Sequence, residues 1–394
     1  MAGVLDGVRV LDFGRYIAGP YCACLLGDLG ADVIRIERPE GGEDRDVIPL
    51  GEHDGGANFL PLNRNKRSLT LDPASQEGRK VVAALVKNAD IVIANLPPQA
   101  LVSMGLDYDT LRAIKPDIIL TTLNAFGSGG PWSHRVGFDG IAQAMSGLVY
   151  MTGHPGDPQK AYGPWADFSA ATFAAFGTLA ALLYRRQTGV GQHVEAPLIK
   201  AALVPATALL AEQSVTNINR GPTANRSQTG APADLFRTKD GWILVQIISQ
   251  ALFKRWTRMV GDESLFYDER FKDDAARVVH SEILSEIMAK WMAERTTEEA
   301  LAALEKASLP GGPLLTPAQV LAHEHLRAIE AFKYLSYPGV PAPVPMLTLP
   351  VTLSATPGVI KSAAPLNGEH SDEILHEAGF SAAEILEFRA HKIV

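Results

Sequence analysis

One aspartate of this sequence stands where a carboxylate can do chemistry. Asp167 follows Gly163-Pro164-Trp165-Ala166 and opens an alanine-rich stretch, Ala166–Arg186, that is predicted to be a helix ending at Thr188-Gly189. A carboxylate in a first helical turn lies in the positive end of the helix dipole, which favours its ionised form. An ionised carboxylate can attack an activated acyl carbon. Aspartate at such a position is also a common helix N-cap, and the residues alone leave both interpretations open.

The glycines near the N-terminus do not form a nucleotide fingerprint. Gly14-Arg15-Tyr16-Ile17-Ala18-Gly19 has the wrong spacing for G-x-G-x-x-G, and the sequence has no P-loop. We therefore expect this part of the chain to bind something other than NAD in the usual place. The missing fingerprint argues against an NAD-dependent dehydrogenase.

The elements that must position Asp167 follow from the alternation of short β-branched runs and helical patterns. The predicted strands are Val8–Phe13, Asp32–Glu37, Ile91–Ala94 and Ile118–Leu123, and the predicted helices are Pro20–Leu29, Gly78–Lys87 and Tyr108–Ile114. Strands separated by single helices indicate right-handed β-α-β crossovers and a parallel sheet. Ligands of such sheets bind at the carboxyl ends of the strands. Those ends carry the loops Gly14–Gly19, Arg38–Asp44, Asn95–Pro98 and Asn124–Gly130.

The length of 394 residues favours two domains. We expect an α/β protein with a large Rossmann-like domain over residues 1–200, a linker over 201–225, a smaller α+β domain over 226–335, and a return segment, 336–394, that completes the large domain. Asp240-Gly241 between two strand-like runs predicts a hairpin at the start of the smaller domain. A helix is expected near Ala382–Arg389.

Composition limits the function classes. The net charge of -8 argues against a general nucleic-acid surface, which needs a basic face. Cys22 and Cys24 are too few and too close for a zinc site or a disulfide, and we interpret them as buried thiols in a reducing compartment. The apolar run Phe168–Leu183 is shorter than a membrane span, and no secretory signal is recognised at the N-terminus. We expect a soluble cytoplasmic protein without a metal site or a membrane partner.

Several motifs in fixed order resemble the family III CoA-transferases, also called the CaiB–BaiF family. They are Leu5–Phe13, Ala18-Gly19-Pro20, Leu29–Glu37, Asn63–Leu69, Thr188–Gln192 and Pro365–His370. The resemblance runs almost end to end and is thin between about 250 and 335. It implies a homodimer whose chains are interlocked, with acyl-CoA and a small carboxylic acid as substrates and no tightly bound cofactor.

The resemblance also implies a mechanism, because Asp167 falls where the family has its catalytic aspartate. That carboxylate attacks an acyl-CoA thioester to give a mixed anhydride. The released CoA thiolate then forms an aspartyl-CoA thioester, which the acceptor acid attacks in turn. The acids exchanged stay open: formate, oxalate, succinate, another dicarboxylate, carnitine or an aromatic acid.

The position of Phe138 bears on a second activity of the same fold. Acyl-CoA racemases resemble this chain but carry Gly-His-Asp where it has Gly137-Phe138-Asp139. Racemisation needs groups that remove and return a proton, and Phe138 can do neither. The neighbouring His134 is interpreted as an exposed loop histidine. CoA transfer is therefore favoured, with a racemase or epimerase as the alternative and a non-catalytic acyl-CoA-binding protein as another.

The resemblance implies a set of CoA-contacting residues. They are Ile17, Ala18, Arg38, Leu71, Asn95, Leu96, Pro97, Arg135, Phe138 and Asp139. Guanidinium groups bind phosphate well, which suits Arg38 and Arg135; a solvated surface arginine is the alternative for each. Ser103 stands where formyl-CoA transferase has an arginine, so a phosphate contact is lost or supplied elsewhere, for which Arg67 and Arg112 are candidates.

Gly311-Gly312-Pro313 in the smaller domain has two interpretations. An anhydride must be shielded from water, and these glycines suit a flexible lid. They equally suit a plain turn.

Overall fold

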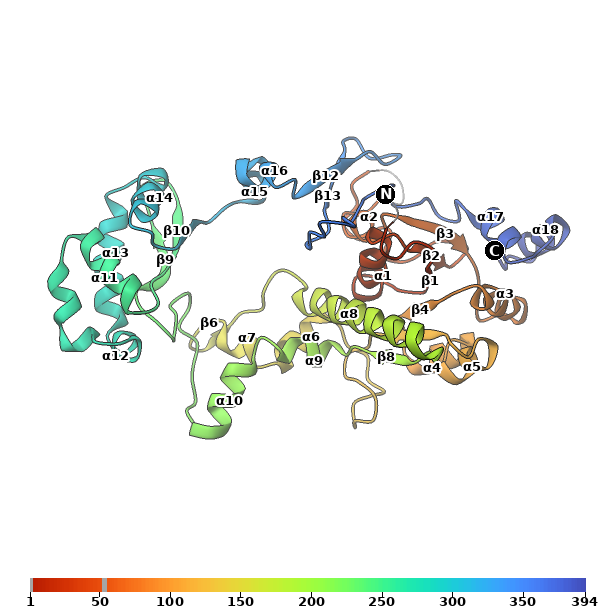
Figure 1. Ribbon diagram of the computed structural model, residues 1–394, viewed down its shortest axis with the longest axis horizontal. Helices are drawn as coiled ribbons and strands as arrows, with labels where there is room; N and C mark the ends of the chain where they lie inside the picture. The colour runs from red at the N-terminus through yellow and green to blue at the C-terminus, as the bar shows by residue number, and fades with distance from the viewer. Residues whose placement is uncertain (1–2, 52–54) are drawn as a thin grey trace. The chain divides into compact units, whose positions relative to one another are not determined.

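The computed structural model describes residues 3–51 and 55–394, and the chain divides into two compact units. The large unit comprises residues 1–148, 160–217 and 327–394, and the small unit comprises 149–159 and 218–326. The small unit therefore takes a short segment, 149–159, from within the first half of the chain. Figure 1 follows both units along the chain.

A parallel sheet of six strands forms the centre of the large unit. Its order is β3-β2-β1-β4-β5-β8, and every neighbouring pair is parallel. The strands are β1 (Arg9–Asp12), β2 (Asp32–Glu37), β3 (Lys66–Thr70), β4 (Ile91–Ala94), β5 (Ile119–Thr122) and β8 (His193–Glu195). The predicted parallel sheet is confirmed, and four of its strands lie where the sequence places them.

The remaining strands, β3 and β8, were missed for physical reasons. β3 begins with Lys66, a charged residue that is buried because its ammonium donates to Asp12 Oδ2 at 2.7 Å and Asn63 Oδ1 at 2.8 Å. Its charged and polar composition hides its place at the edge of the parallel sheet. β8 has three residues, which is too short for a recognisable alternation.

Helices cover both faces of this sheet. Those of the large unit are α1 (Ala18–Asp28), α2 (Phe59–Leu62), α3 (Gln76–Lys87), α4 (Pro98–Met104), α5 (Tyr108–Ile114), α6 (Asp139–Met145), α8 (Trp165–Thr188), α9 (Leu198–Leu203), α10 (Thr207–Thr216), α17 (Ser371–Glu377) and α18 (Ala382–Ala390). Alternate strand residues point to opposite faces. Val10 accordingly belongs to a core with α1, α8 and α9, and Leu11 to a core with α3, α5, α17 and α18.

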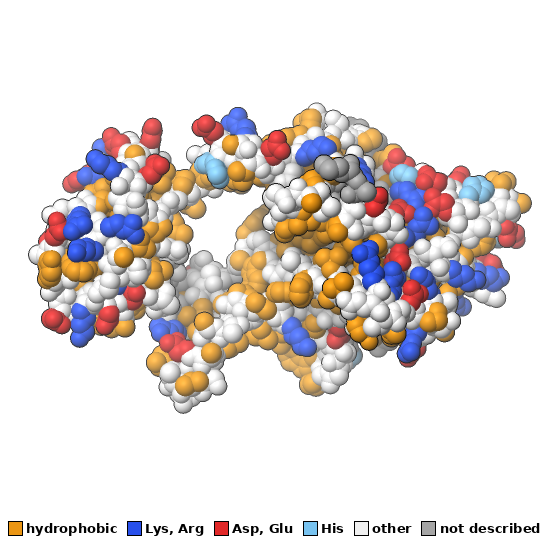
Figure 2. Space-filling model, viewed as in Figure 1, with side chains coloured by type: hydrophobic (Ala, Val, Ile, Leu, Met, Phe, Trp, Pro, Cys, Tyr) orange, Lys and Arg blue, Asp and Glu red, His pale blue; other side chains and the backbone are white. Residues whose placement is uncertain are grey.

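The helix α8 is long and apolar enough to cross a membrane, by length and composition alone. The expectation that its apolar run is too short for a span was therefore wrong. Its alanine face, with Ala166, Ala170 and Ala174, is buried in the core of the large unit. Other apolar side chains of α8 are exposed, among them Phe176 at 72%. Figure 2 shows hydrophobic side chains gathered over the part of the large unit where Figure 1 places α8.

The small unit is built on an antiparallel sheet of three strands. β9 (Ala233–Arg237) and β10 (Trp242–Gln246) form the hairpin predicted at Asp240-Gly241, and β11 (Gly311–Pro313) pairs with β10. Both interpretations of Gly311-Gly312-Pro313, lid and turn, were wrong. This strand is hard to recognise from the sequence, because Gly311 and Gly312 have no side chains that could form an alternating pattern. Only its backbone pairs with β10.

Helices complete the small unit, and short elements connect it to the large one. They are β6 (Gly153–His154), β7 (Asp157–Pro158), α11 (Gln250–Val260), 3-10 turns at Glu263–Tyr267 and Glu269–Phe271, α12 (Asp274–Val279), α13 (Ser281–Ala293), α14 (Thr297–Lys306) and α15 (Pro317–Ala322), with α7 (Leu148–Met151) and α16 (Glu324–Ala328) at the boundaries. Trp256, Met288 and Leu304 lie in its core.

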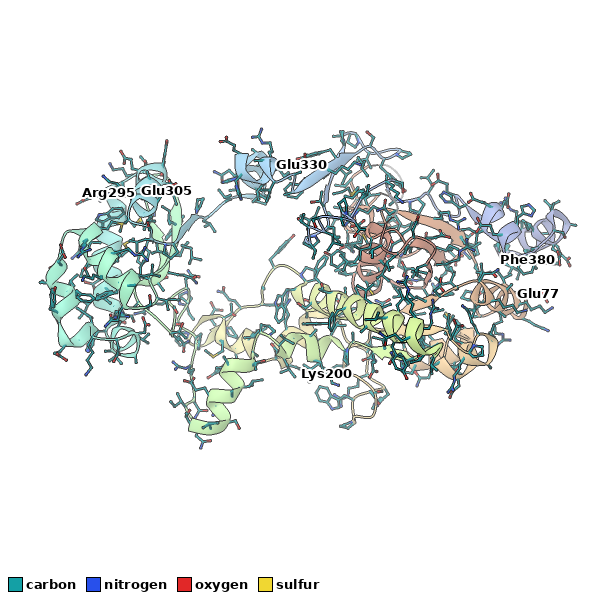
Figure 3. The ribbon with its side chains drawn as sticks, viewed as in Figure 1. Glu77, Lys200, Arg295, Glu305, Glu330 and Phe380 are labelled. Atoms are coloured by element: carbon teal, nitrogen blue, oxygen red, sulfur yellow. The ribbon has the colours of Figure 1, made fainter. Side chains whose placement is uncertain are left out.

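The C-terminal segment returns to the large unit. After the hairpin of β12 (Phe332–Leu335) and β13 (Val344–Leu347), the chain runs beside β3, where His370 N donates to Ser68 O at 3.0 Å. Phe380 lies at the turn between α17 and α18 (Figure 3) and packs edge-on against Phe388. The return segment thereby covers one edge of the sheet.

Candidate active site

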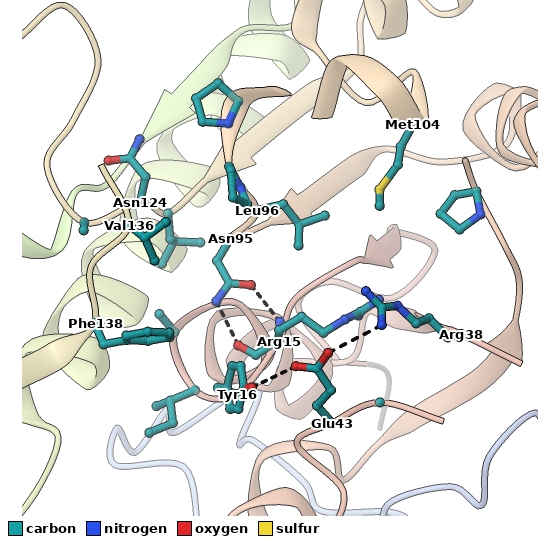
Figure 4. A pocket seen from close by; sticks show the side chains of 18 of the residues that line it. Arg15, Tyr16, Arg38, Glu43, Asn95, Leu96, Met104, Asn124, Val136 and Phe138 are labelled. Atoms are coloured by element: carbon teal, nitrogen blue, oxygen red, sulfur yellow. Dashed lines mark hydrogen bonds and ion pairs between the residues drawn. The ribbon is translucent and has the colours of Figure 1, made fainter. Parts of the chain in front are cut away.

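A pocket of about 900 Å³ lies at the carboxyl ends of the parallel strands. The loops after β1, β2, β3, β4 and β5 contribute to its wall, as do Leu198 of α9 and Asp167 of α8. This is the edge of the sheet at which ligands of such folds bind. Figure 4 shows Phe138 and Val136 at one side of the pocket and Arg38 and Met104 at the other.

Asp167 lies in the third position of α8, and another aspartate caps that helix. Oδ1 of Asp139 accepts hydrogen bonds from the backbone N–H groups of Ala166 at 2.8 Å and Asp167 at 3.2 Å. Gln143 holds Asp139 in place by donating to its Oδ2 at 2.6 Å and to Gly163 O at 3.1 Å. Since Pro164 is the N-cap residue, the N-cap interpretation of Asp167 was wrong. Its carboxylate is left free to face the pocket.

The pKa of Asp167 departs from the prediction. Burial, and secondly the negative charge of Asp139, raise the pKa of Asp167 to about 7 from an ordinary value of 3.8. The expectation that the helix dipole keeps this carboxylate ionised was wrong, because the N–H groups of the first turn already bind the carboxylate of Asp139. Asp167 therefore changes its charge near neutral pH, as many catalytic carboxylates do.

The first loop is fixed to the fourth strand of the chain by one amide side chain. Arg15 N donates to Asn95 Oδ1 at 2.7 Å, and Asn95 Nδ2 donates back to Arg15 O at 2.8 Å. Tyr16 has a positive φ of 59°, which is uncommon for a residue other than glycine. The Asn95 bonds and a bond from Tyr16 N to Asp44 Oδ2 at 3.1 Å hold this turn.

Buried charges support the second loop. Arg35 donates to both oxygens of Asp44 at 2.8 Å, and Arg45 donates to Glu37 at 2.6 Å. These four side chains have almost no exposed surface, and removing one partner from such a pair leaves a buried charge uncompensated. At the surface of the same loop, Glu43 accepts from the Tyr16 hydroxyl at 2.9 Å and pairs with Arg38 at 3.4 Å (Figure 4).

The loop from Arg135 to Phe138 forms the wall next to Asp167. The Phe138 ring is 62% exposed and meets Tyr16 edge-on, with ring centroids 6.2 Å apart. The guanidinium of Arg135 lies 4.0 Å from the centroid of the Trp132 ring. Gly137 is required by close approach, because a Cβ there would stand 2.7 Å from Ala125 Cβ.

Most of the predicted contact residues line the pocket. They are Ile17, Ala18, Arg38, Asn95, Leu96, Pro97, Arg135 and Phe138. Leu71 does not, because its side chain is fully buried in the core, and Asp72, Pro73 and Ala74 line the wall instead. Asp139 does not either, because it lies beneath the wall as the cap of α8.

The candidates to replace an arginine at Ser103 do not line the pocket. Arg67 is held in ion pairs with Asp32, Glu373 and Glu377, and Arg112 is exposed on α5 away from the wall. Ser103 itself donates to Ala100 O at 2.9 Å.

Several wall residues escaped the sequence analysis. Arg15 and Tyr16 belong to the Gly14–Gly19 loop, which was predicted to bind a ligand, but they were not predicted to contact it. Their position in that loop is the sequence feature that could have identified them. Arg389 and Lys392 come from the end of the chain, and only the topology brings them to this edge of the sheet.

Known proteins are similar to this chain in both sequence and fold. A family model described as CoA-transferase family III matches residues 5–371. The chain belongs to that family. A succinyl-CoA–D-citramalate CoA-transferase of Chloroflexus aurantiacus is 32% identical over 99% of this chain and 98% of its own length. A succinate–glutarate CoA-transferase of Agrobacterium fabrum is 32% identical over 95% of each chain. A solved CaiB/BaiF family protein from Brucella suis has a TM-score of 0.83 and 32% identity, covering 96% of this chain and 100% of its own.

The family membership makes a CoA thioester a substrate of this CoA-transferase. No group of three or more His, Cys, Asp or Glu side chains that could hold a metal ion occurs within residues 3–51 and 55–394.

Proposed function

We propose that this CoA-transferase moves CoA from an acyl-CoA donor to a free carboxylic acid through covalent intermediates on Asp167. The observation that carries the proposal is the placement of Asp167. Its carboxylate faces the pocket, has no hydrogen-bond or ion-pair partner among the described residues, and has a pKa raised to about 7. A desolvated carboxylate is a stronger nucleophile than a hydrated one, and near pH 7 a large fraction of it is ionised.

The first half-reaction loads CoA onto the enzyme. An oxygen of ionised Asp167 attacks the thioester carbonyl carbon, the carbon–sulfur bond breaks, and CoA leaves as the thiolate. The product is a mixed anhydride between Asp167 and the donor acid. The thiolate then attacks the aspartyl carbonyl carbon, the donor acid leaves as its carboxylate, and Asp167 holds CoA as a thioester.

The second half-reaction repeats these steps with the acceptor. The acceptor carboxylate attacks the aspartyl-CoA thioester, which expels the CoA thiolate and forms a second anhydride. The thiolate attacks the acyl carbon of the acceptor, and Asp167 is released as a carboxylate. No proton is gained or lost overall, so the site needs a nucleophile and no separate acid or base.

The substrate class is proposed from the relatives. Their names pair succinyl-CoA or succinate with citramalate and glutarate, which are dicarboxylic acids. We accordingly propose succinyl-CoA as the first donor to test and dicarboxylates as the first acceptors. We also propose that the enzyme works as a cytoplasmic homodimer.

Hydroxylamine trapping tests the covalent step. Anhydrides and thioesters react with hydroxylamine, and free carboxylates do not. The enzyme incubated with succinyl-CoA and hydroxylamine, without acceptor, should lose activity and carry a hydroxamate on the tryptic peptide that contains Asp167. Asp167→Asn should give no adduct while binding CoA. An active enzyme whose Asp167 stays unmodified contradicts the proposal, and an adduct on a different carboxylate keeps the mechanism but rejects this residue.

Proton exchange tests the racemase alternative. Phe138 cannot transfer protons, although His134 lines the same pocket. A 2-methylacyl-CoA incubated with the enzyme in deuterated water should keep its α-proton, as mass spectrometry can show. Deuterium uptake at a rate comparable with turnover would favour the racemase.

A further inference from the structure

The last residues of the chain form part of the pocket wall, at the side away from Asp167. Arg389 and Lys392, at and after the end of α18, line the pocket together with Arg38 and Asp72–Ala74. The loops that carry Arg38 and Asp72–Ala74 follow β2 and β3, at one edge of the sheet. Phe138 lies across the pocket from Arg38 and meets Tyr16 of the loop after β1, and its neighbour Asp139 binds the backbone of Asp167.

This tail is anchored firmly. Asp72 N donates to Ile393 O at 2.7 Å, and Ile393 N donates to Phe388 O at 2.8 Å, while Phe388 is buried in the core. Lys392 between these bonds has a φ of +56°, in the left-handed region that lysine rarely occupies. Surrounding contacts must hold such a conformation, and here they fix Lys392 at the wall.

The cationic side chains at this end of the pocket differ in whether a carboxylate of the protein already pairs with them. Arg38 pairs with Glu43 at 3.4 Å, and Arg389 pairs with Asp372 at 2.7 Å. Lys392 has no ion pair or hydrogen bond from its ammonium within residues 3–51 and 55–394. Three side-chain carboxylates also line this end of the pocket: Asp72 accepts from Ala74 N at 3.1 Å, Glu43 is bound by Tyr16 and Arg38, and Glu40 is exposed to solvent. The ammonium group of Lys392 is therefore available to bind an anion.

The direction of bound CoA follows from the chemistry. The thioester carbon must reach Asp167, so the sulfur end lies near Phe138 and the loop after β1 that Phe138 meets. Two strand spacings separate β1 from β3, which is about 10 Å across the sheet. The 3′-phosphate stands on the ribose, at the end of CoA far from its thiol. An extended CoA with its sulfur at Asp167 therefore brings that phosphate toward β3 and the tail.

We propose that Lys392, supported by Arg389, binds the 3′-phosphate of CoA and makes the enzyme prefer CoA to dephospho-CoA. The inference rests on the proposed function, since it takes the position of the sulfur from Asp167. Ammonium and guanidinium groups form strong charge-assisted hydrogen bonds with phosphate. The C-terminal tail is thus a specificity element of the substrate site.

Calorimetric titration with CoA and dephospho-CoA, which differ only in the 3′-phosphate, tests the assignment. Wild-type enzyme should bind CoA at least about tenfold more tightly, and Lys392→Gln should weaken CoA binding about tenfold while leaving dephospho-CoA binding unchanged. Arg389→Gln should act in the same direction. Lys87→Gln removes a lysine that is exposed on α3 and outside the pocket wall, so it should change neither affinity.

Asp372→Asn separates a contact from a packing effect. It breaks the ion pair with Arg389 and leaves the cation in place, so CoA binding should be unchanged or tighter. If Lys392→Gln weakens the binding of CoA and dephospho-CoA equally, or weakens neither, the proposed phosphate contact is overturned. The conclusion that the enzyme binds CoA is unaffected by that result. Hydroxylamine trapping at Asp167 is independent of the tail, so its failure would reject the proposed function separately.

Discussion

At the scale of single residues, Asp167 should set the pH dependence of the reaction. Its raised pKa of about 7 means that the nucleophilic form is lost as the pH falls through that value. We expect kcat/KM for the acyl-CoA donor to rise tenfold per pH unit below about pH 6 and to level off above about pH 8. Initial rates at subsaturating succinyl-CoA across this range measure the profile. A flat profile through pH 7 would contradict the assignment.

Asp139 should shift that profile through its charge. Asp139→Asn keeps an oxygen that can accept from the first turn of α8 but removes the negative neighbour of Asp167. The pKa of Asp167 should fall and the midpoint of kcat/KM should move to lower pH, although not to an ordinary value, because burial is the larger cause. Asp109→Asn, an exposed first-turn carboxylate of α5, should leave the midpoint where it is. A midpoint that moves upward would reject this electrostatic role.

Asp167 should also make stability depend on pH. Native Asp167 keeps its proton up to about pH 7, whereas the unfolded chain releases it near 3.8, so the native state loses stability as the pH rises between these values. Asp167→Asn removes this loss. It should be more stable than wild type by at most about 4 kcal/mol at about pH 8 and nearly equal to it at about pH 4. Urea unfolding at both pH values measures the difference, and an equal gain at both would show another cause.

At the scale of elements, the side chain of Asn95 should matter more for binding than for chemistry. Asn95→Ala removes both bonds that fix the Gly14–Gly19 loop, at a cost of about 1–3 kcal/mol of stability. KM for the donor should rise several-fold while kcat falls less, because Asp167 stands on a different element. Steady-state kinetics check this, with Asn88→Ala, an exposed residue at the end of α3, as the control. A loss confined to kcat would contradict it.

The same scale shows how far a sequence can predict this fold. The elements with regular patterns, such as β2, β4 and α5, lie where they were predicted. β3 was missed because buried Lys66 is neutralised by Asp12 from another strand, and such pairing is invisible in a linear pattern. The same limit applies to the site. The loops after the strands were predicted from their positions in the sequence. The cap of α8 by Asp139 and the wall residues of the tail were not, because they depend on contacts between distant segments.

At the scale of the whole molecule, we expect two chains to associate. α8 exposes Phe173, Phe176 and Leu183 on the face opposite its buried alanines, and monomers rarely leave such a surface uncovered. Light scattering coupled to size exclusion should give about twice the chain mass of 42.3 kDa. Phe176→Glu should lower that mass toward a single chain or reduce solubility, whereas Leu386→Glu, at a side chain of α18 that is also exposed, should leave the mass unchanged. A wild-type monomer would reject the homodimer.

The anchoring of the tail has a consequence for synthesis of the protein. The pocket joins Tyr16 and Arg38, which are synthesised early, to Arg389 and Lys392, which are synthesised much later. The sheet can pair its early strands before the wall is finished, but the nucleotide end of the substrate has its full binding surface only after Arg389 and Lys392 have been synthesised. A ligand that binds only the native state stabilises it in proportion to its affinity. CoA would therefore protect chains that contain Arg389 and Lys392 from proteases more than chains that stop before them.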